Sequence, residues 1–338
     1  MPVPPLFRSA VLLLLVAGCG GPRPAAPSAP AGAPAPVFAV QPPPTWTVDG
    51  LRVATLNGEF LFDGEGDEGE ATFDWKGDPA AARAHRDGIA RIIRMLDADV
   101  VMIPETENLG VLERMIAESL ADLGYTPHLV PGLDRFTGQN LGLLSRVPVE
   151  AVGRINETVP VGVTDQRYGV SKNLWARVTL LGRPTTLVGV HFLAQPDNPE
   201  RRPRREAQAE VIRAFVAQEA AAGREVVVLG DFNDFDDAIR DRNHSRPISD
   251  VLAIVKRAGD GPADDLVNVL GDVPQAERFT SLYDRNNNDQ IEEGELSAID
   301  HILLSPGLYR LVRDVRYVHS HDPREVTDHF PVVVTLAE

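Results

Sequence analysis

The sequence has very few of some residue types. Its 338 residues include one cysteine, Cys19, so no disulfide can form within the chain. Lysine occurs only at positions 76, 172 and 256, and no acidic residue precedes Asp49. No apolar run is long enough to serve as a permanent membrane-spanning helix. These absences exclude a disulfide-stabilised miniprotein and a protein with several membrane spans.

The composition that remains is that of a globular protein with a large core and an acidic surface. Hydrophobic residues make up 43% and charged residues 24% of the chain, and the formal net charge is −16. From Trp46 onward the net charge is −18, because 31 basic residues face 49 acidic ones. A field of this sign does not attract a polyanion, so a nucleic-acid or phospholipid partner would require local cations.

The N-terminus has the pattern of a signal peptide. Arg8 precedes an apolar run over residues 10–16, which Ala17, Gly18 and Cys19 follow. The segment 15–19 resembles the bacterial lipobox, in which the cysteine thiol receives a lipid. An ordinary signal peptide with an incidental cysteine is the alternative, but the only cysteine stands where a lipobox requires it. We therefore expect a signal peptide over 1–18 and a lipid-anchored protein of the bacterial cell envelope, periplasmic or surface-exposed, that contacts the membrane through this lipid only.

A proline-rich segment separates the N-terminus from the rest of the chain. Residues 20–46 contain nine of the 28 prolines and no acidic residue. Such a composition favours an extended spacer, so we assign residues 19–46 to a tether. No second linker and no internal repeat interrupts the remainder, and residues 47–338 are expected to form one domain, a monomer.

Strands and helices are interspersed along this domain. Alternating or continuous apolar runs predict strands, and Asp78 followed by Pro79 predicts the start of a helix. The expected strands are 51–56, 99–103, 141–144, 174–180, 186–190, 225–229, 299–304 and 331–336, and the expected helices are 79–96, 109–123 and 206–222. The fold class is α/β or α+β, because periodicity does not distinguish a doubly wound sheet from two stacked sheets.

Polar residues stand at the ends of these apolar strands, where a core does not require them. They are Asn57, Glu105, His191, Asp231 with Asn233, Asp300, and Asp328 with His329. Singly, such residues are usually turn formers or structural histidines. Together, at the edges of sheets, they indicate a site for a hard cation beside a general base.

The same residues lie in motifs that resemble the endonuclease/exonuclease/phosphatase superfamily, the deoxyribonuclease-I-like phosphodiesterases. The motifs, in order, are ATLN at 54–57, IPETEN at 103–108, GLLSR at 142–146, VH at 190–191, GDFN at 230–233, IDHI at 299–302 and TDHFP at 327–331. The resemblance implies an α+β four-layer sandwich, in which two mixed β-sheets pack face to face between outer helices.

The resemblance also implies roles for individual residues. Glu105 and Asn57, with Asp328 or Asp231, would hold Mg²⁺ or Mn²⁺. His329, oriented by Asp300, would take a proton from the attacking water, and His191 would donate to the phosphate or the leaving oxygen. Asp231 and Asn233 would position water and phosphate. Lys172 stands where relatives often carry a phosphate-binding Arg, and Pro104 stands where they usually carry Gln.

A second motif lies within the domain as an insertion at residues 284–295. It resembles the calcium loop of EF-hands, with expected ligands Asp284, Asn286, Asn288, Gln290 (backbone carbonyl), Glu292 and Glu295. Asp289 replaces the usual glycine, and Asp tolerates a left-handed backbone better than most residues. A solvated acidic loop is the alternative. We expect bound Ca²⁺ with a structural role.

Three functions are compatible with these features. The first is a metal-dependent nuclease of the cell surface that cleaves DNA or RNA. The second is the same chemistry on a sphingomyelin-like lipid or an inositol-phosphate-like ester. The third is a binding protein on an inactive scaffold, which retention of all the expected site residues argues against. The acidic run 65–70 is interpreted as a surface loop, with metal contact as the minor alternative. The basic cluster 201–205 is interpreted equally as charge balance at a helix start or as a phosphate contact.

Overall fold

The computed structural model describes residues 37–195, 198–257, 259 and 261–338. The expected signal peptide, Cys19 and most of the expected tether lie outside these residues. Within the described part, no helix is both long and apolar enough to cross a membrane.

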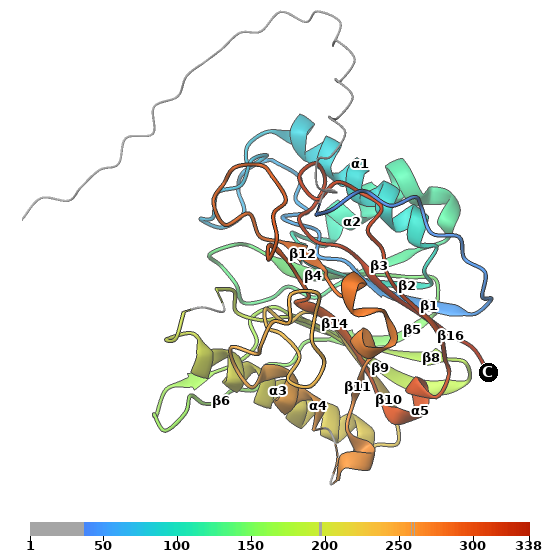
Figure 1. The fold of residues 1–338 in the computed structure, drawn as a ribbon, viewed down its shortest axis with the longest axis vertical. Helices are drawn as coiled ribbons and strands as arrows, with labels where there is room; N and C mark the ends of the chain where they lie inside the picture. The colour runs from blue at the N-terminus through green and yellow to red at the C-terminus, as the bar shows by residue number, and fades with distance from the viewer. Residues whose placement is uncertain (1–36, 196–197, 258, 260) are drawn as a thin grey trace, which may run out of the picture. The chain divides into compact units, whose positions relative to one another are not determined.

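Two six-stranded sheets form the centre of the domain (Figure 1). The first has the order β15-β16-β1-β2-β4-β3 and the second the order β11-β14-β10-β9-β8-β5. The strands of the first sheet are β1 (Leu51–Thr55), β2 (Val100–Thr106), β3 (Thr126–Leu129), β4 (Asn140–Ser145), β15 (Val312–Tyr317) and β16 (Val332–Leu336). Those of the second are β5 (Val149–Gly153), β8 (Asn173–Leu180), β9 (Arg183–His191), β10 (Glu225–Asp231), β11 (Val267–Asn268) and β14 (Asp300–Leu304).

Two small hairpins and several helices complete the domain. The hairpins pair β6 (Val159–Pro160) with β7 (Arg167–Tyr168), and β12 (Ser281–Leu282) with β13 (Leu296–Ser297). The α-helices are α1 (Pro79–Leu96), α2 (Leu109–Met115), α3 (Arg202–Ala221), α4 (Val251–Lys256) and α5 (Pro306–Tyr309). A π-helical turn (Ile116–Leu120) and a 3₁₀ turn (Ala121–Leu123) extend α2, and further 3₁₀ turns lie at Pro262–Asp264, Val269–Asp272 and Gln275–Glu277.

Three apolar cores hold the layers together. The central core joins the two sheets, with Met102 and Leu141 from the first sheet and Leu187 and Leu229 from the second. The second core packs α1 and α2 on the outer face of the first sheet, and the third packs α3 and α4 on the outer face of the second sheet (Figure 1). Most central strands bury both faces, as their continuous apolar runs require, whereas the edge strands β3, β5 and β15 are only partly buried. The structure confirms the four-layer sandwich.

Local sequence determines where the helices begin and end. Asp78 accepts hydrogen bonds from the backbone N–H groups of Ala80 and Ala81, and Pro79 occupies the first turn of α1. Asp97, in the left-handed conformation, ends that helix. Helix α3 begins at Arg202, four residues before the expected start, because Pro203 in its first turn also favours a helical start.

The compact unit starts at Val37, ten residues before the domain boundary expected from the sequence. Phe38 contacts the rings of Phe279 and Phe330 at centroid distances of 6.2 and 5.4 Å. The backbone oxygen of Val37 accepts a hydrogen bond from Arg242, and the N–H of Gln41 donates to His319. The last part of the proline-rich segment therefore packs on the domain.

Candidate active site

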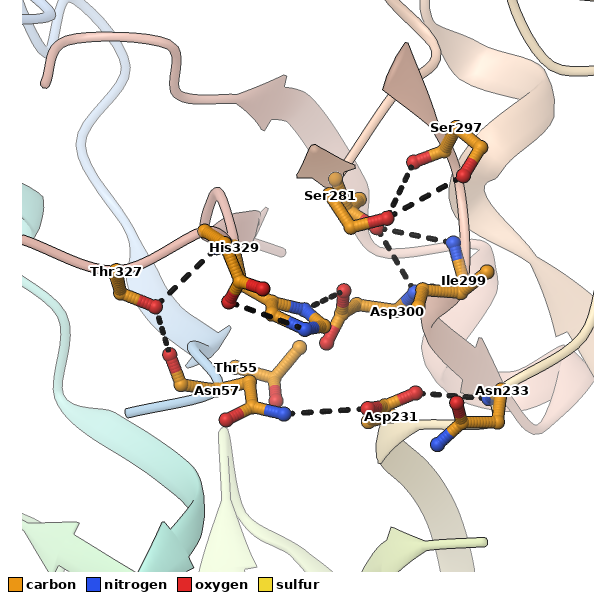
Figure 2. Close-up of polar contacts among 12 residues, drawn as sticks. Thr55, Asn57, Asp231, Asn233, Ser281, Ser297, Ile299, Asp300, Thr327 and His329 are labelled. Carbon is orange, nitrogen blue, oxygen red and sulfur yellow. Dashed lines mark hydrogen bonds and ion pairs between the residues drawn. The ribbon is translucent and has the colours of Figure 1, made fainter. Parts of the chain in front are cut away.

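Side chains from both sheets meet where β1, β2, β9 and β10 end and β14 begins. Asn57 follows β1, Glu105 lies near the end of β2, and His191 ends β9. Asp231 ends β10 and is paired in register with Asp300, the first residue of β14. His329 reaches the same place from the segment before β16. Six of the residues expected to form one site thus lie together (Figure 2 shows four of these six).

Asn57 connects the carboxylates of the two sheets. Its buried amide nitrogen donates to Glu105 Oε1 and to Asp231 Oδ2, at 3.2 Å each. Its amide oxygen accepts from the N–H of Glu59, and its backbone oxygen accepts from the hydroxyl of Thr327, the first residue of the TDHFP motif. Thr327 also accepts from the N–H of His329, so Asn57 and His329 are held to the same side chain.

Glu105 is directed into the site by a β-bulge. The pairing of β2 with β4 matches Pro104 to Leu141 and Thr106 to Asn140, which leaves Glu105 as the extra residue. Its φ is +64°, a conformation unusual for a residue with a side chain. Bulges of this kind often direct a side chain in an active site. Gln139 Nε2 and the N–H of Phe60 donate to Glu105 Oε2, at 2.6 and 3.0 Å.

His191 and Lys172 lie on the other side of the same two carboxylates. His191 Nε2 is 3.8 Å from Glu105 Oε1 and 3.6 Å from Asp231 Oδ2. The ammonium of Lys172 donates to Gln139 Oε1 and lies 3.4 Å from His191 Nε2. Burial and, next, the positive charges of Lys172 and His329 lower the pKa of His191 well below its usual value. His191 is therefore neutral near pH 7.

His329 is oriented by a carboxylate. Its Nδ1 lies 2.7 Å from Asp300 Oδ2 (Figure 2). Its Nε2 lies 3.8 Å from Asp328 Oδ1. Burial opposes the charged form of the imidazole, but the charges of Asp300 and Asp328 outweigh it and raise the pKa of His329. Thr280 fixes the backbone of Asp300 by accepting its N–H. The pair is arranged as a base histidine with its orienting acid.

The remaining carboxylates are close to one another. Burial, followed by the charge of Asp300, raises the pKa of Asp231 to about 7. Asp231 Oδ1 accepts the N–H of Asn233, whose amide nitrogen in turn donates to the backbone oxygen of Phe192. Asn233 is held with φ +49°. Backbone strain at Glu105 and Asn233 is the kind that accumulates at functional sites.

Two residues of the site were not expected from the sequence. Glu59 accepts the N–H of Asp328, and burial, followed by the charge of Asp328, raises the pKa of Glu59 to about 8. Gln139 supplies Glu105 with an amide hydrogen bond and links it to Lys172. An acid two residues after Asn57 and an amide just before β4 both stand at strand ends, which is the signal that could have revealed them.

Several other residues lie outside the site. His301 is buried between Asp234 and Asn268, so it is a neighbour of the site and makes structural contacts. In the basic cluster, Arg202 pairs with Glu206 and Asp250, and Arg205 is buried beside Asp234. The acidic run 65–70 contains one buried side chain, Glu68.

The loop 284–295 connects β12 to β13 and has no flanking long helices. The carboxylates of this loop accept hydrogen bonds from the loop itself. Asp284 accepts the backbone N–H groups of Asn286 and Asn288, and Glu292 accepts the side-chain amides of the same two residues. Glu295 accepts the backbone N–H of Glu292. Asp289 adopts φ +57°. Among the described residues, two groups of acidic or histidine side chains are close enough to share an ion, and this loop is in neither. Calcium binding here stays a prediction.

The fit of the active site to a divalent cation rests on its carboxylates. Asp231, Asp300 and His329 form one of the two groups whose ligand atoms lie within 4.8 Å of each other. Asp300 Oδ1 is buried and has no hydrogen-bond partner in the described part of the chain. With Glu105 and Asp328 nearby, carboxylates outnumber the cationic side chains, so the donor set fits a hard cation.

Comparison with known proteins agrees with this geometry. The model of the endonuclease/exonuclease/phosphatase family matches residues 54–329. The chain belongs to this family. Phosphoester hydrolysis is therefore the class of chemistry expected of the site, and the resemblance first seen in the sequence motifs is confirmed. None of the curated proteins compared with this chain matches it.

Solved structures of the family share the fold. The 3′ phosphatase NExo from Neisseria, bound to a product DNA hairpin, is 16% identical with a TM-score of 0.55, and the match covers 85% of this chain and 100% of that one. An AP endonuclease from Archaeoglobus fulgidus is 15% identical with a TM-score of 0.55, over 85% and 100% of the two chains. Danio rerio TDP2 with a single-stranded DNA product is 15% identical with a TM-score of 0.52, over 86% and 100%.

Proposed function

We propose that this chain is a metal-dependent phosphodiesterase of the cell envelope that hydrolyses phosphodiester bonds in DNA or RNA. The observation that carries the proposal is the convergence of Asn57, Glu105, His191, Asp231 and the Asp300–His329 pair from both sheets at one point. Two family members of the same fold have been solved with DNA products, which supports a nucleic-acid substrate.

The proposed cation is Mg²⁺ or Mn²⁺. Glu105 and Asn57, with Asp328 or Asp231, would hold it through oxygen atoms, and Asp300 Oδ1, which has no hydrogen-bond partner among the described residues, belongs to the same group of side chains. When bound, such an ion polarises a phosphate oxygen and stabilises the charge that develops on it. It would also offset the mutual repulsion of the carboxylates.

Side chains of the protein accept the proton of the attacking water and donate hydrogen bonds to the phosphate. Because Asp300 holds the Nδ1 of His329, its Nε2 faces the site, and the neutral form of the ring accepts the proton of the attacking water. His191, neutral and 3.6 Å from Asp231, donates a hydrogen bond to the phosphate or to the leaving oxygen. Asn233 and Asp231 position the water and the phosphate, and Lys172 adds positive charge behind them.

The location in the cell and the second ion are also proposals. The lipobox-like segment ending at Cys19 supports a lipid anchor on the bacterial envelope. The ligand spacing at 284–295 and the left-handed Asp289 support Ca²⁺ in that loop. We take the protein to act as a monomer.

The test is hydrolysis of a substrate panel by the purified protein. Plasmid DNA, RNA, sphingomyelin and an inositol phosphate are each incubated with Mg²⁺, with Mn²⁺ and with EDTA. We expect cleavage of nucleic acid, its loss in EDTA and its recovery when Mg²⁺ is added. Cleavage of sphingomyelin or of the inositol phosphate alone would reassign the substrate. Failure to cleave any substrate with either metal would favour the inactive binding protein.

Matched variants connect the activity to the site. His329→Gln is expected to reduce kcat by a factor on the order of a hundred or more, since general-base catalysis contributes about that much. Glu105→Gln is expected to reduce it at least as far. His128→Gln and Glu113→Gln make the same chemical changes away from the site and should retain activity. Unchanged rates in the first two variants would reject the site.

A further inference from the structure

A second group of carboxylates lies beside the end of β2, apart from the residues proposed for catalysis. Asp63, Asp67 and Glu68 come from the loop after β1, and Glu107 directly follows β2. One carboxylate oxygen from each lies within 4.8 Å of the others. An acidic cluster alone is common on protein surfaces, so the state of the individual side chains decides whether it is a site.

Glu68 provides the decisive observation. It is only 8% exposed, and neither of its carboxylate oxygens has a hydrogen-bond partner among the residues that the structure describes. Its carboxylate points into the group formed with Asp63, Asp67 and Glu107. A buried carboxylate without donors is strongly destabilising unless a charge of opposite sign compensates it.

No side chain in the described part of the chain provides that charge. Among the residues that the structure describes, no lysine, arginine or histidine forms an ion pair with any of the four carboxylates. The nearest lysine in the loop, Lys76, donates instead to the backbone oxygens of Glu68, Gly69 and Ala71.

The loop that carries the cluster has a defined shape. Gly64 and Gly66 adopt positive φ, at +81° and +84°, which permits the tight path of the backbone. The N–H groups of Glu70 and Ala71 both donate to the backbone oxygen of Phe136. A Cβ on Gly138 would come within 3.2 Å of the Cβ of Glu68, so the two segments are in close contact. Glu68 is therefore held in place by its backbone.

We propose that Asp63, Asp67, Glu68 and Glu107 bind one Ca²⁺ ion, at a site distinct from the active site and from the loop 284–295. Four carboxylates from a curved loop and a strand end suit Ca²⁺, which takes six to eight oxygen ligands in flexible geometry. Because Asp67 is exposed, water can reach the ion and fill its remaining coordination positions.

The ion would stabilise the segment that supports Glu105. The N–H of Leu61 donates to the backbone oxygen of Glu105, and the N–H of Glu107 donates to the backbone oxygen of Leu61. Asp63 N–H donates to Glu107 Oε2, and Phe60 N–H donates to Glu105 Oε2. A few hydrogen bonds of the loop after β1 thus connect the proposed calcium site to Glu105, the proposed metal ligand of the active site.

The test is calorimetric titration of the full-length protein, freed of metal, with calcium chloride alone. Glu68→Gln is expected to remove one Ca²⁺ per chain or to weaken its binding at least tenfold, and the exposed Asp67→Asn is expected to weaken it also. Glu65→Gln and Glu70→Gln are the matched controls, because they remove the same charge from exposed positions of the same loop. Glu295→Gln removes an expected ligand of the loop 284–295, so any Ca²⁺ binding lost in this variant belongs to that loop and not to the proposed site.

Thermal unfolding provides a second readout that does not depend on activity. Ca²⁺ is expected to raise the Tm of the wild type and of Glu65→Gln, but not that of Glu68→Gln. In EDTA, Glu68→Gln should unfold at the same temperature as the wild type or higher, because it removes an uncompensated buried charge. Identical Ca²⁺ titrations for Glu68→Gln and Glu65→Gln would overturn the proposal.

Discussion

Asp300 acts on the reaction through His329, whose Nδ1 it binds at 2.7 Å. We expect Asp300→Asn to lower kcat by roughly a hundredfold, the usual contribution of an oriented base, with little change in KM. Because the Asp300 charge raises the pKa of His329, its removal should also move the acidic limb of the pH–rate profile to lower pH. Asp165→Asn, at an exposed position, is the control. A fall in rate without any shift of the limb would mean that Asp300 has only a structural role.

His85 makes the stability of the fold depend on pH. It is buried behind the site, donates to the backbone oxygen of Gly58 and stacks on Trp75. Burial lowers its pKa to about 4, below the ordinary value of 6.5 for a histidine, so between these two pH values the unfolded chain binds a proton and the folded chain does not. The stability that neutral His85 contributes is therefore present above pH 6.5 and is lost as the pH falls towards 4, in total about 3 kcal/mol.

The measurement is urea unfolding of wild type and His85→Gln between pH 7.5 and pH 4.5. The stability difference between the two should shrink as the pH falls. The difference between the two proteins is compared because the raised pKa values of Asp231 and Glu59 increase the stability of both proteins as the pH falls, which is opposite to the effect of His85. A difference that does not vary with pH would contradict the buried, neutral state of His85.

Most residues of the candidate site could be predicted, because a polar residue directly after an apolar run can be recognised from the sequence alone. Asn57, Glu105, His191 and Asp231 were found in this way. Glu59 and Gln139 were not, because their roles depend on contacts with Asp328 and Glu105, which are distant in sequence. The protonation of His191 and His329 also could not be predicted, since it depends on burial and on neighbouring charges.

At the scale of elements, continuous apolar runs identified the inner strands, and β1, β9, β10, β14 and β16 were expected within a few residues of where they lie. The edge strands β3, β5 and β15 were missed, because their side chains are only partly buried and carry no clear apolar pattern. The bulge at Glu105 was also invisible, since it is defined by pairing with β4.

The segment around Phe38 behaves as an element of the domain. Phe38 packs on Phe330, which directly follows His329. We expect Phe38→Ala to reduce the free energy of unfolding by about 1–2 kcal/mol, as expected for a half-buried aromatic side chain. Val40→Ala, at a residue that is 50% exposed, should change it by much less. The measurement is urea unfolding, and equal effects of the two substitutions would show that the segment is not part of the core.

The charge of the whole molecule affects its encounter with a polyanion. With a formal charge of −16, the protein repels nucleic acid at long range. Salt screens that repulsion, so kcat/KM for DNA should rise roughly twofold to tenfold as ionic strength increases towards about 0.15 M. A small diester such as bis(p-nitrophenyl) phosphate should show little change. A steep fall for DNA, typical of proteins that release counterions, would instead indicate that local arginines dominate the approach.

The left-handed backbone at Glu105 and at Asn233 has a consequence for how the sequence tolerates change. Glycine adopts that conformation without steric cost, whereas Glu and Asn do not. In a library of single substitutions, selection for soluble, protease-resistant protein should thus accept glycine at both positions. Selection for growth that depends on hydrolysis should eliminate it. If glycine is enriched under the first selection and depleted under the second, the reaction requires Glu105 and Asn233 although the backbone would favour glycine there.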